Sequence, residues 1–312
     1  MSQAIAVKPT GRLRAYARLA KLSFFDYYLA APVVWALLPS DLRNDPKVLW
    51  TLVVTTLGWV AMTAATVAFD DVHGFRDGSD DVNYDPKAAL RNRERKPLLN
   101  GDLTEHQALR FGYLALLASL LWMGVAVAIA PHTPAWVLLL IPFQIAISVQ
   151  YSHGMRLSYR GGQELVLLLS PGLMALIPYG LVDGHFTGVI ALETYLIGVW
   201  SLLVSVYSNV NDRDGDRAAG RKNLATVLTP SAYSVAIALI SLTETAALLI
   251  AWAADAVPGW FLLCMVPVLV MRARQLRAGL GQNNALLARK LGVDTHRLGV
   301  AALLIANLLV IR

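Results

Sequence analysis

Long apolar stretches recur along this chain, and they constrain its fold more than any other feature. Nine of them approach the length that a helix needs to cross a bilayer, and they lie at residues 22–40, 48–69, 108–131, 134–150, 163–183, 187–208, 231–254, 257–271 and 298–311. Hydrophobic residues make up 56% of the 312 positions and charged residues only 15%, which is too apolar for an ordinary soluble domain. Because a spanning segment must satisfy its own backbone polar groups, all nine are predicted to be helices. We therefore expect an all-α, polytopic membrane helix bundle of about nine transmembrane helices, forming a single domain over residues 1–312.

Basic residues are distributed unevenly between the two faces of such a bundle. In a nine-span topology, only Arg43, Lys47 and Arg312 fall on the side opposite the amino terminus. Since Lys and Arg concentrate in cytoplasmic loops, residues 1–21 are predicted to be a basic cytoplasmic segment. Separately, we expect the membrane to be a bacterial inner (plasma) membrane. This topology accounts for the net charge of +6, so no nucleic-acid partner is expected. The single cysteine, Cys264, lies in an apolar stretch and indicates neither a disulfide framework nor a thiol catalyst.

Two acidic segments follow apolar stretches on the predicted cytoplasmic side. The second is the more regular, because Asn209, Asp212 and Asp216 would share one face of a continuing helix. An amide and two carboxylates on one face supply oxygen ligands of the kind that Mg²⁺ prefers, with water and phosphate oxygens completing its shell. We predict that these three residues bind Mg²⁺.

The first acidic segment is denser and less regular. Its predicted metal ligands are Asp70, Asp71, Asp77 and Asp81. Three of them, Asp70, Asp77 and Asp81, fall with Gly74 on one helical stripe. Gly74 and Gly78 weaken a regular helix. Asp71 or Asp80 could therefore bind the metal in place of a member of this stripe.

Basic residues follow both acidic segments. Those predicted to bind a diphosphate are Arg76, Arg95, Lys96, Arg217 and Lys222, with Arg221 as a further candidate. Two opposed acidic segments that each bind Mg²⁺ are suited to neutralising a diphosphate leaving group. When diphosphate leaves an allylic carbon, a delocalised carbocation remains, and an electron-rich partner captures it if water is excluded. A helix bundle with a lipid-accessible apolar cavity suits this chemistry with a long isoprenoid chain.

Two simpler interpretations of the acidic segments remain open. Acidic residues at helix ends are often solvated loop residues, which would explain a single Asp-x-x-x-Asp pattern. An ion or proton pathway is the other, although such pathways usually place carboxylates near mid-membrane on broken helices. Here Glu193 and Glu244 are the acids within predicted spans, and Glu164 lies at an interface.

The motifs resemble those of the UbiA superfamily of intramembrane prenyltransferases. The segment Asn209-x-x-Asp212-x-x-x-Asp216-Arg217-Ala218-Ala219-Gly220 is similar to that family's second aspartate motif. Lys-Pro-Leu-Leu-Asn-Gly at 96–101 resembles its Arg-Pro-Leu-x-x-Gly, and residues 151–161 are similar to the stretch before the fifth helix in the dihydroxynaphthoate (menaquinone) branch. The first motif departs from the family pattern, because Asp70-Asp71 replaces the usual Asn-Asp and Gly74 stands where a later Asp is usual.

The resemblance implies Mg²⁺-dependent transfer of a prenyl group from a polyprenyl diphosphate to an aromatic acceptor, in quinone or specialised-metabolite biosynthesis. It implies catalytic roles for Asp212 and Asp216, one of which would also take a proton from a phenolic acceptor. Residues implied near the diphosphate are Tyr151, Ser152 and Arg160, and those near the acceptor are Arg156 and His153. The partners expected are these two substrates and membrane lipid, with no protein partner. Two alternatives are an integral membrane terpene cyclase of the same superfamily and an isoprenoid lipid carrier or transporter.

Overall fold

A computed structural model of the chain describes residues 11–22, 29–84 and 93–310, and within these ranges all regular secondary structure is helical. The helices are α1 (Arg12–Leu19), α2 (Ala30–Leu37), α3 (Pro46–Arg76), α4 (Ser79–Asn83), α5 (Glu105–Ile129), α6 (Ala135–Val149), α7 (Gln163–Val182), α8 (Gly188–Ala218), α9 (Leu224–Val227), α10 (Pro230–Ala253), α11 (Gly259–Leu276) and α12 (Ala285–Val310). Short 3₁₀ turns, η2 (Arg93–Arg95) and η3 (Leu157–Tyr159), lie in loops, and a π-helical turn, η4 (Arg277–Gly281), continues α11. The all-helical prediction is confirmed.

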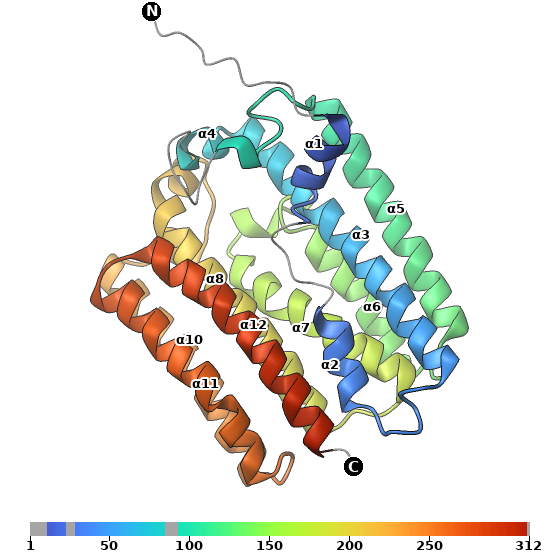
Figure 1. Cartoon of the computed structure of the whole chain (residues 1–312). Coiled ribbons are helices and arrows are strands. Elements are labelled where there is room, and N and C mark those ends of the chain that lie inside the picture. Colours follow the sequence, from blue (N-terminus) through green and yellow to red (C-terminus); the bar gives the residue numbers. More distant parts are fainter. Residues whose placement is uncertain (1–10, 23–28, 85–92, 311–312) are drawn as a thin grey trace, which may run out of the picture.

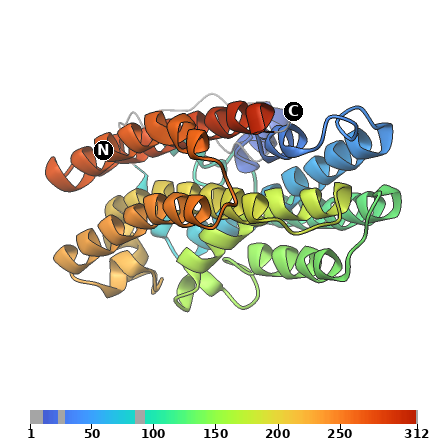
Figure 2. The same cartoon turned by 90° about the horizontal axis from the view of Figure 1, so that it is seen from below.

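The long helices run side by side, and the short helices α1 and α4 gather at one end of the bundle (Figure 1). Two views at right angles place the pair α3 and α5 on one side and α10 and α11 on the other (Figures 1 and 2). Between these pairs lie α7 and α8, which pack against each other, and α8 also packs against α12. The end that carries α4 therefore collects the carboxyl-terminal ends of both α3 and α8.

Six helical segments of the described chain are long and apolar enough to cross a membrane, namely α3, α5, α7, α8, α10 and α11 with η4. The other three predicted spans have different lengths or compositions. Helix α6 is apolar but has only 15 residues. Helix α2 has 8, and residues 23–28 of its predicted span lie outside the described ranges. Helix α12 has 26 residues, and its first half carries charges such as Arg289 and Asp294. Length and composition thus support six of the nine predicted spans.

The helices differ in how much apolar surface they leave uncovered. Helix α7 is mostly buried, whereas α5 and α10 leave most of their apolar residues partly or fully exposed, including Leu121 and Ile250. Such surfaces suit contact with lipid chains, which are as apolar as the side chains themselves. The two central helices approach closely because Gly172 and Gly198 face the backbone carbonyls of Thr194 and Leu168, where a methyl group would not fit.

Candidate active site

The first acidic segment is divided between two helices rather than lying on one. Helix α3 ends at Arg76, and Gly78 adopts a left-handed conformation with φ of +77° before α4 begins. Glycine tolerates this conformation because it has no Cβ. The expected stripe therefore breaks after α3, so Asp70 and Asp81 do not share the face of one helix.

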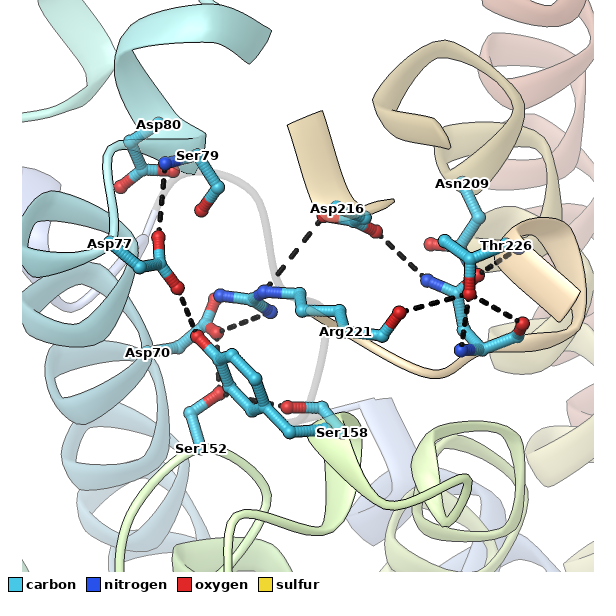
Figure 3. A network of polar contacts seen from close by, with 12 residues as sticks. Asp70, Asp77, Ser79, Asp80, Ser152, Ser158, Asn209, Asp216, Arg221 and Thr226 are labelled. Atoms are coloured by element: carbon cyan, nitrogen blue, oxygen red, sulfur yellow. Dashed lines mark hydrogen bonds and ion pairs between the residues drawn. The ribbon is translucent and has the colours of Figure 1, made fainter. Parts of the chain in front are cut away.

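Asp70 is a carboxylate of the first segment that contacts two later segments of the chain. Ser152 donates its hydroxyl to Asp70 Oδ1 over 2.6 Å, and Arg221 Nη1 lies 3.2 Å from the same oxygen. Figure 3 shows Asp70, Ser152 and Arg221 converging from three different segments. Asp70 is thus a point at which α3 meets the loops after α6 and α8.

Asp71 and Asp80 share one lysine beneath the surface. Lys96 Nζ lies 2.7 Å from an oxygen of each carboxylate, and Lys21 Nζ is 3.2 Å from Asp71. Burial raises the pKa of Asp80 to about 6, with the neighbouring Asp71 carboxylate adding to the rise and Lys96 opposing it. Although burial alone would lower it, these carboxylates hold the pKa of Lys96 well above its ordinary value. Gly74 permits this pairing, because any side chain there would run into the Asp80 carboxylate.

Asp77 and Asp81 have other partners. Asp77 accepts hydrogen bonds from the hydroxyl of Tyr159 and from the backbone N–H of Ser79, at 3.0 Å for the latter. Asp81 is 59% exposed and pairs with Arg93 at 2.8 Å. Neither carboxylate is among the described residues that line the cavity defined below, so their predicted metal-binding role stays a prediction.

The second acidic segment keeps the geometry that its spacing predicts. Helix α8 continues without a break to Ala218 and carries Asn209, Asp212 and Asp216 on one face toward the cavity. Asn223 donates to Asp216 over 2.8 Å, and Gln163 donates to the side-chain oxygen of Asn209 over 3.0 Å. Three oxygen-bearing side chains therefore line a single wall.

One cation connects the two acidic segments. The guanidinium of Arg221, which is 9% exposed, lies 3.2 Å from Asp70 and 3.8 Å from Asp216 (Figure 3). Within the described residues no three His, Cys, Asp or Glu side chains form a metal cage by themselves. A Mg²⁺ ion that binds through one or two carboxylates and phosphate oxygens does not require such a cage, and the oxygen-rich donors of the α3 and α8 ends suit it.

A cavity of about 840 Å³ opens beside these groups. At the polar end, its described lining includes Arg14, Arg18, Lys21, Asp70, Asp80, Arg95, Lys96, Tyr151, Gln163, Asn209, Asp212, Asp216, Arg221 and Arg289. Deeper, apolar side chains such as Met62, Met174, Ile197 and Val300 alternate with hydroxyl groups, and these hydroxyl residues are Thr63, Thr66, Ser148, Ser170, Ser201, Ser205 and Ser208. The cavity thus joins a charged mouth to a mainly apolar interior.

The other residues predicted at the diphosphate are distributed unevenly around this mouth. Arg95, Lys96 and Tyr151 line the cavity, and burial together with the Asp70 carboxylate raises the pKa of Tyr151, which keeps its phenol protonated. Ser152 is buried and reaches the site only through Asp70. The remaining four lie off the described cavity lining: Arg76 pairs with Glu105, Arg217 donates to the Thr226 carbonyl, and Arg160 and Lys222 are exposed.

The two residues predicted at the acceptor lie outside the described cavity wall. His153 stacks on Phe69 with ring centroids 4.4 Å apart, and its Nε2 is 3.0 Å from the hydroxyl of Tyr113. Burial and the nearby Arg76 lower the pKa of His153, which favours a neutral ring. Arg156 covers the ring of Tyr159 at 4.0 Å. The role of His153 and Arg156 at the acceptor stays a prediction, and their position off the described cavity wall does not support it.

Several cavity residues were not among those predicted. Lys21 lines the cavity and ends the basic amino-terminal segment. Its positive charge next to the first predicted span could have marked it as a candidate. Gln163 and Arg289 belong to segments whose sequence indicates nothing about a shared site. Tertiary packing alone brings them to the two acidic segments.

Comparison with known proteins identifies the family of this chain. The profile of the UbiA prenyltransferase family matches residues 29–302. The chain belongs to the UbiA prenyltransferase family. The family prediction is confirmed, and with six apolar helices it identifies the chain as an integral membrane protein. Among curated proteins, none matches this chain.

Solved structures share the UbiA fold at low sequence identity. An apo UbiA homolog from Aeropyrum pernix K1 is 14% identical with a TM-score of 0.65, covering 95% of this chain and 98% of its own. A UbiA homolog from Archaeoglobus fulgidus bound to DMAPP and Mg²⁺ is 13% identical with a TM-score of 0.64, covering 92% and 98%. A digeranylgeranylglyceryl phosphate synthase structure is 10% identical with a TM-score of 0.62, covering 95% and 99%. At these identities the likeness establishes the fold alone.

Proposed function

We propose that this UbiA-family chain transfers a prenyl group from a polyprenyl diphosphate to an aromatic acceptor within the membrane, with Mg²⁺ as cofactor. The observation that carries the proposal is the meeting of both acidic segments, joined by Arg221, at the mouth of one cavity. Homologs bound to DMAPP or GPP together with Mg²⁺ support a diphosphate substrate and this metal. Because residues 151–161 resemble the dihydroxynaphthoate (menaquinone) branch, we propose an acceptor of that type.

The proposed Mg²⁺ ligands are Asp70, Asn209, Asp212 and Asp216. When bound, Mg²⁺ would neutralise the diphosphate as it leaves the allylic carbon. Arg221, Arg95 and the phenol of Tyr151 would donate hydrogen bonds to the phosphate oxygens at the cavity mouth. The apolar interior would bind the isoprenoid chain and exclude the water that competes for the carbocation.

The deeper hydroxyl groups bear on the choice between transfer and cyclisation. Seven Ser and Thr side chains line the described interior, and the aromatic residues of the described lining are Tyr84, Tyr151 and His296, with no Phe or Trp among them. A cyclase must guide a long-lived carbocation, for which aromatic faces provide favourable contacts. Hydroxyl groups instead suit the recognition of a polar acceptor. The hydroxyl groups are the ground on which we propose the transferase, and the product analysis below decides between it and the terpene cyclase.

A different class of acceptor also belongs in any test. A digeranylgeranylglyceryl phosphate synthase shares this fold, so a glycerol phosphate lipid is a reasonable second acceptor alongside phenolic and naphthoic acids. The carrier hypothesis differs from both, because a carrier would bind isoprenoid diphosphates without releasing diphosphate.

The decisive experiment measures diphosphate release by purified protein in detergent with Mg²⁺. Geranyl, farnesyl and geranylgeranyl diphosphates are each supplied alone and with the acceptor panel, and products are identified by mass spectrometry. Acceptor-dependent release with a mass gain of one prenyl group supports the proposal. A cyclic hydrocarbon formed without acceptor would identify a cyclase, and binding without release would favour the carrier.

We further propose nine spanning helices, with the amino terminus and active site facing the cytoplasm of a bacterial cell. Cysteines placed singly in the loops before α3 and after α8 test this topology by their reactivity with a membrane-impermeant thiol reagent. The loop before α3 is expected to react in intact cells, and the loop after α8 only after permeabilisation. The reverse pattern would contradict the proposed orientation.

A further inference from the structure

Tyr159 occupies a position between two guanidinium groups. Its ring centroid lies 4.0 Å from Arg156 Cζ and 4.9 Å from Arg221 Cζ. A guanidinium over an aromatic face is attracted by the ring quadrupole, more strongly when water is excluded. Tyr159 thus contacts both Arg156, off the described cavity lining, and Arg221, which belongs to it.

The orientation of the Tyr159 ring is held by bonds from several segments. Its hydroxyl donates to Asp77, which follows the last turn of α3. The loop that carries the ring also meets the loop that carries Arg221, since the N–H of Lys222 donates to the carbonyl of Ser158 over 3.2 Å. The ring is therefore attached both to the first acidic segment and to the chain beside Arg221.

Arg221 needs such support to serve both acidic segments at once. Its long side chain must reach Asp70 and Asp216, which lie on different helices, at 3.2 and 3.8 Å. An unrestrained arginine would lose considerable rotamer freedom on being held there. The face of Tyr159 reduces the freedom of the guanidinium before any ligand binds, as preorganised sites do.

We propose that Tyr159 is a positioning residue, which holds Arg221 where it contacts both acidic segments and the diphosphate. This inference rests on the proposed diphosphate-binding role of Arg221 and deepens it. It also reassigns Asp77 from the metal site to the anchoring of this ring.

The test compares Tyr159→Leu with Tyr159→Phe in purified protein. Leu removes the aromatic face, so we expect the Kd of Mg²⁺-bound inorganic pyrophosphate to rise about tenfold. Phe keeps the face and loses only the hydroxyl, so the rise should be at most about threefold. Tyr195→Leu, in a tyrosine of α8 whose hydroxyl bonds Thr243 away from the described cavity lining, is the matched control and should leave this Kd unchanged.

A double-mutant cycle distinguishes positioning from general destabilisation. If Tyr159 acts through Arg221, Tyr159→Leu added to Arg221→Gln should weaken pyrophosphate binding no further than Arg221→Gln alone. Additive losses, or equal losses in the Leu and Phe variants, would overturn the inference. Because pyrophosphate binding needs no prenyl transfer, the cycle can succeed or fail independently of the proposed reaction.

Discussion

The two acidic segments of this chain have similar compositions but different local structures. The second lies on an unbroken helix, and Asn209, Asp212 and Asp216 all face the cavity. The first is broken at Gly78, and its carboxylates are divided among several partners, with Lys96 shared by Asp71 and Asp80 and Arg93 paired with Asp81. Both segments place two carboxylates on the described cavity lining, Asp70 and Asp80 in the first and Asp212 and Asp216 in the second, and continuity of the helix decides whether the two share one helical face.

The difference extends to how each segment is neutralised. In the first, Asp71 and Asp80 are buried with Lys96. In the second, Arg221 lies beside Asp216, and Asn223 donates to it. We therefore expect substitutions in the second segment to affect chemistry and most substitutions in the first to affect folding or little at all.

The largest expected effect is the loss of activity when Asp212 or Asp216 is replaced by Asn. Each variant keeps the side-chain shape and removes a proposed metal-binding charge, so the rate of diphosphate release should fall at least about 10³-fold, equivalent to about 4 kcal/mol in the barrier. The control is Asp214→Asn, in an exposed residue of the same turn, which should stay within about twofold of wild type. Equal losses in all three would mean that the face of the helix does not matter.

A somewhat smaller loss is expected for Asp70→Asn, the one variant of the first segment predicted to act on chemistry. Removing this charge leaves Arg221 with Asp216 alone, so the rate should fall about 10²-fold. The Mg²⁺ concentration for half-maximal rate should also rise, and excess chelator should abolish the wild-type rate. An unchanged Mg²⁺ dependence would remove Asp70 from the proposed ligands.

Asp71→Asn should instead reduce stability. Asp71 is fully buried, and without its charge the buried Lys96 keeps Asp80 as its near partner. Breaking one side of a buried ion pair typically costs about 3–5 kcal/mol, although Asp80 should reduce that cost here. The measurement is the midpoint of thermal unfolding in detergent.

A second substitution, in Lys96, tests whether the loss of stability in Asp71→Asn comes from the Asp71–Lys96 ion pair. Combining Asp71→Asn with Lys96→Met removes both charges, so the double variant should be less destabilised than the sum of the two single variants. Additive losses would mean that the two side chains are not coupled, in contradiction to their 2.7 Å separation.

Much of the helical bundle could be predicted because spanning helices must be long and apolar. The predicted apolar ranges differ from the helices at their ends. Helix α3 continues past residue 69 to Arg76, and α12 begins at Ala285 rather than near residue 298. Hydropathy detects apolar surface, whereas a helix continues through polar residues until a residue such as Gly78 ends it. The polar ends that hydropathy missed are the parts that carry the site.

The candidate site was predictable only where it depends on local periodicity. The spacing of Asn209, Asp212 and Asp216 specifies a shared face once the helix continues. The pairing of Arg221 with Asp70, and of Tyr159 with Asp77, joins segments distant in sequence and follows from packing. For the same reason a single sequence did not indicate which carboxylates of the first segment face away from the cavity.

The smallest expected effect is that of Asp81→Asn, which tests the comparison most directly. Asp81 is 59% exposed and pairs with Arg93 at the surface, and exposed pairs contribute about 0–1 kcal/mol. The rate of diphosphate release and its Mg²⁺ dependence should therefore stay within about twofold of wild type. Arg93→Gln is the matched variant on the other side of the pair and should behave alike. A loss of about tenfold or more in Asp81→Asn alone would return Asp81 to the metal site, and it would mean that the segment around Gly78 rearranges when substrate binds.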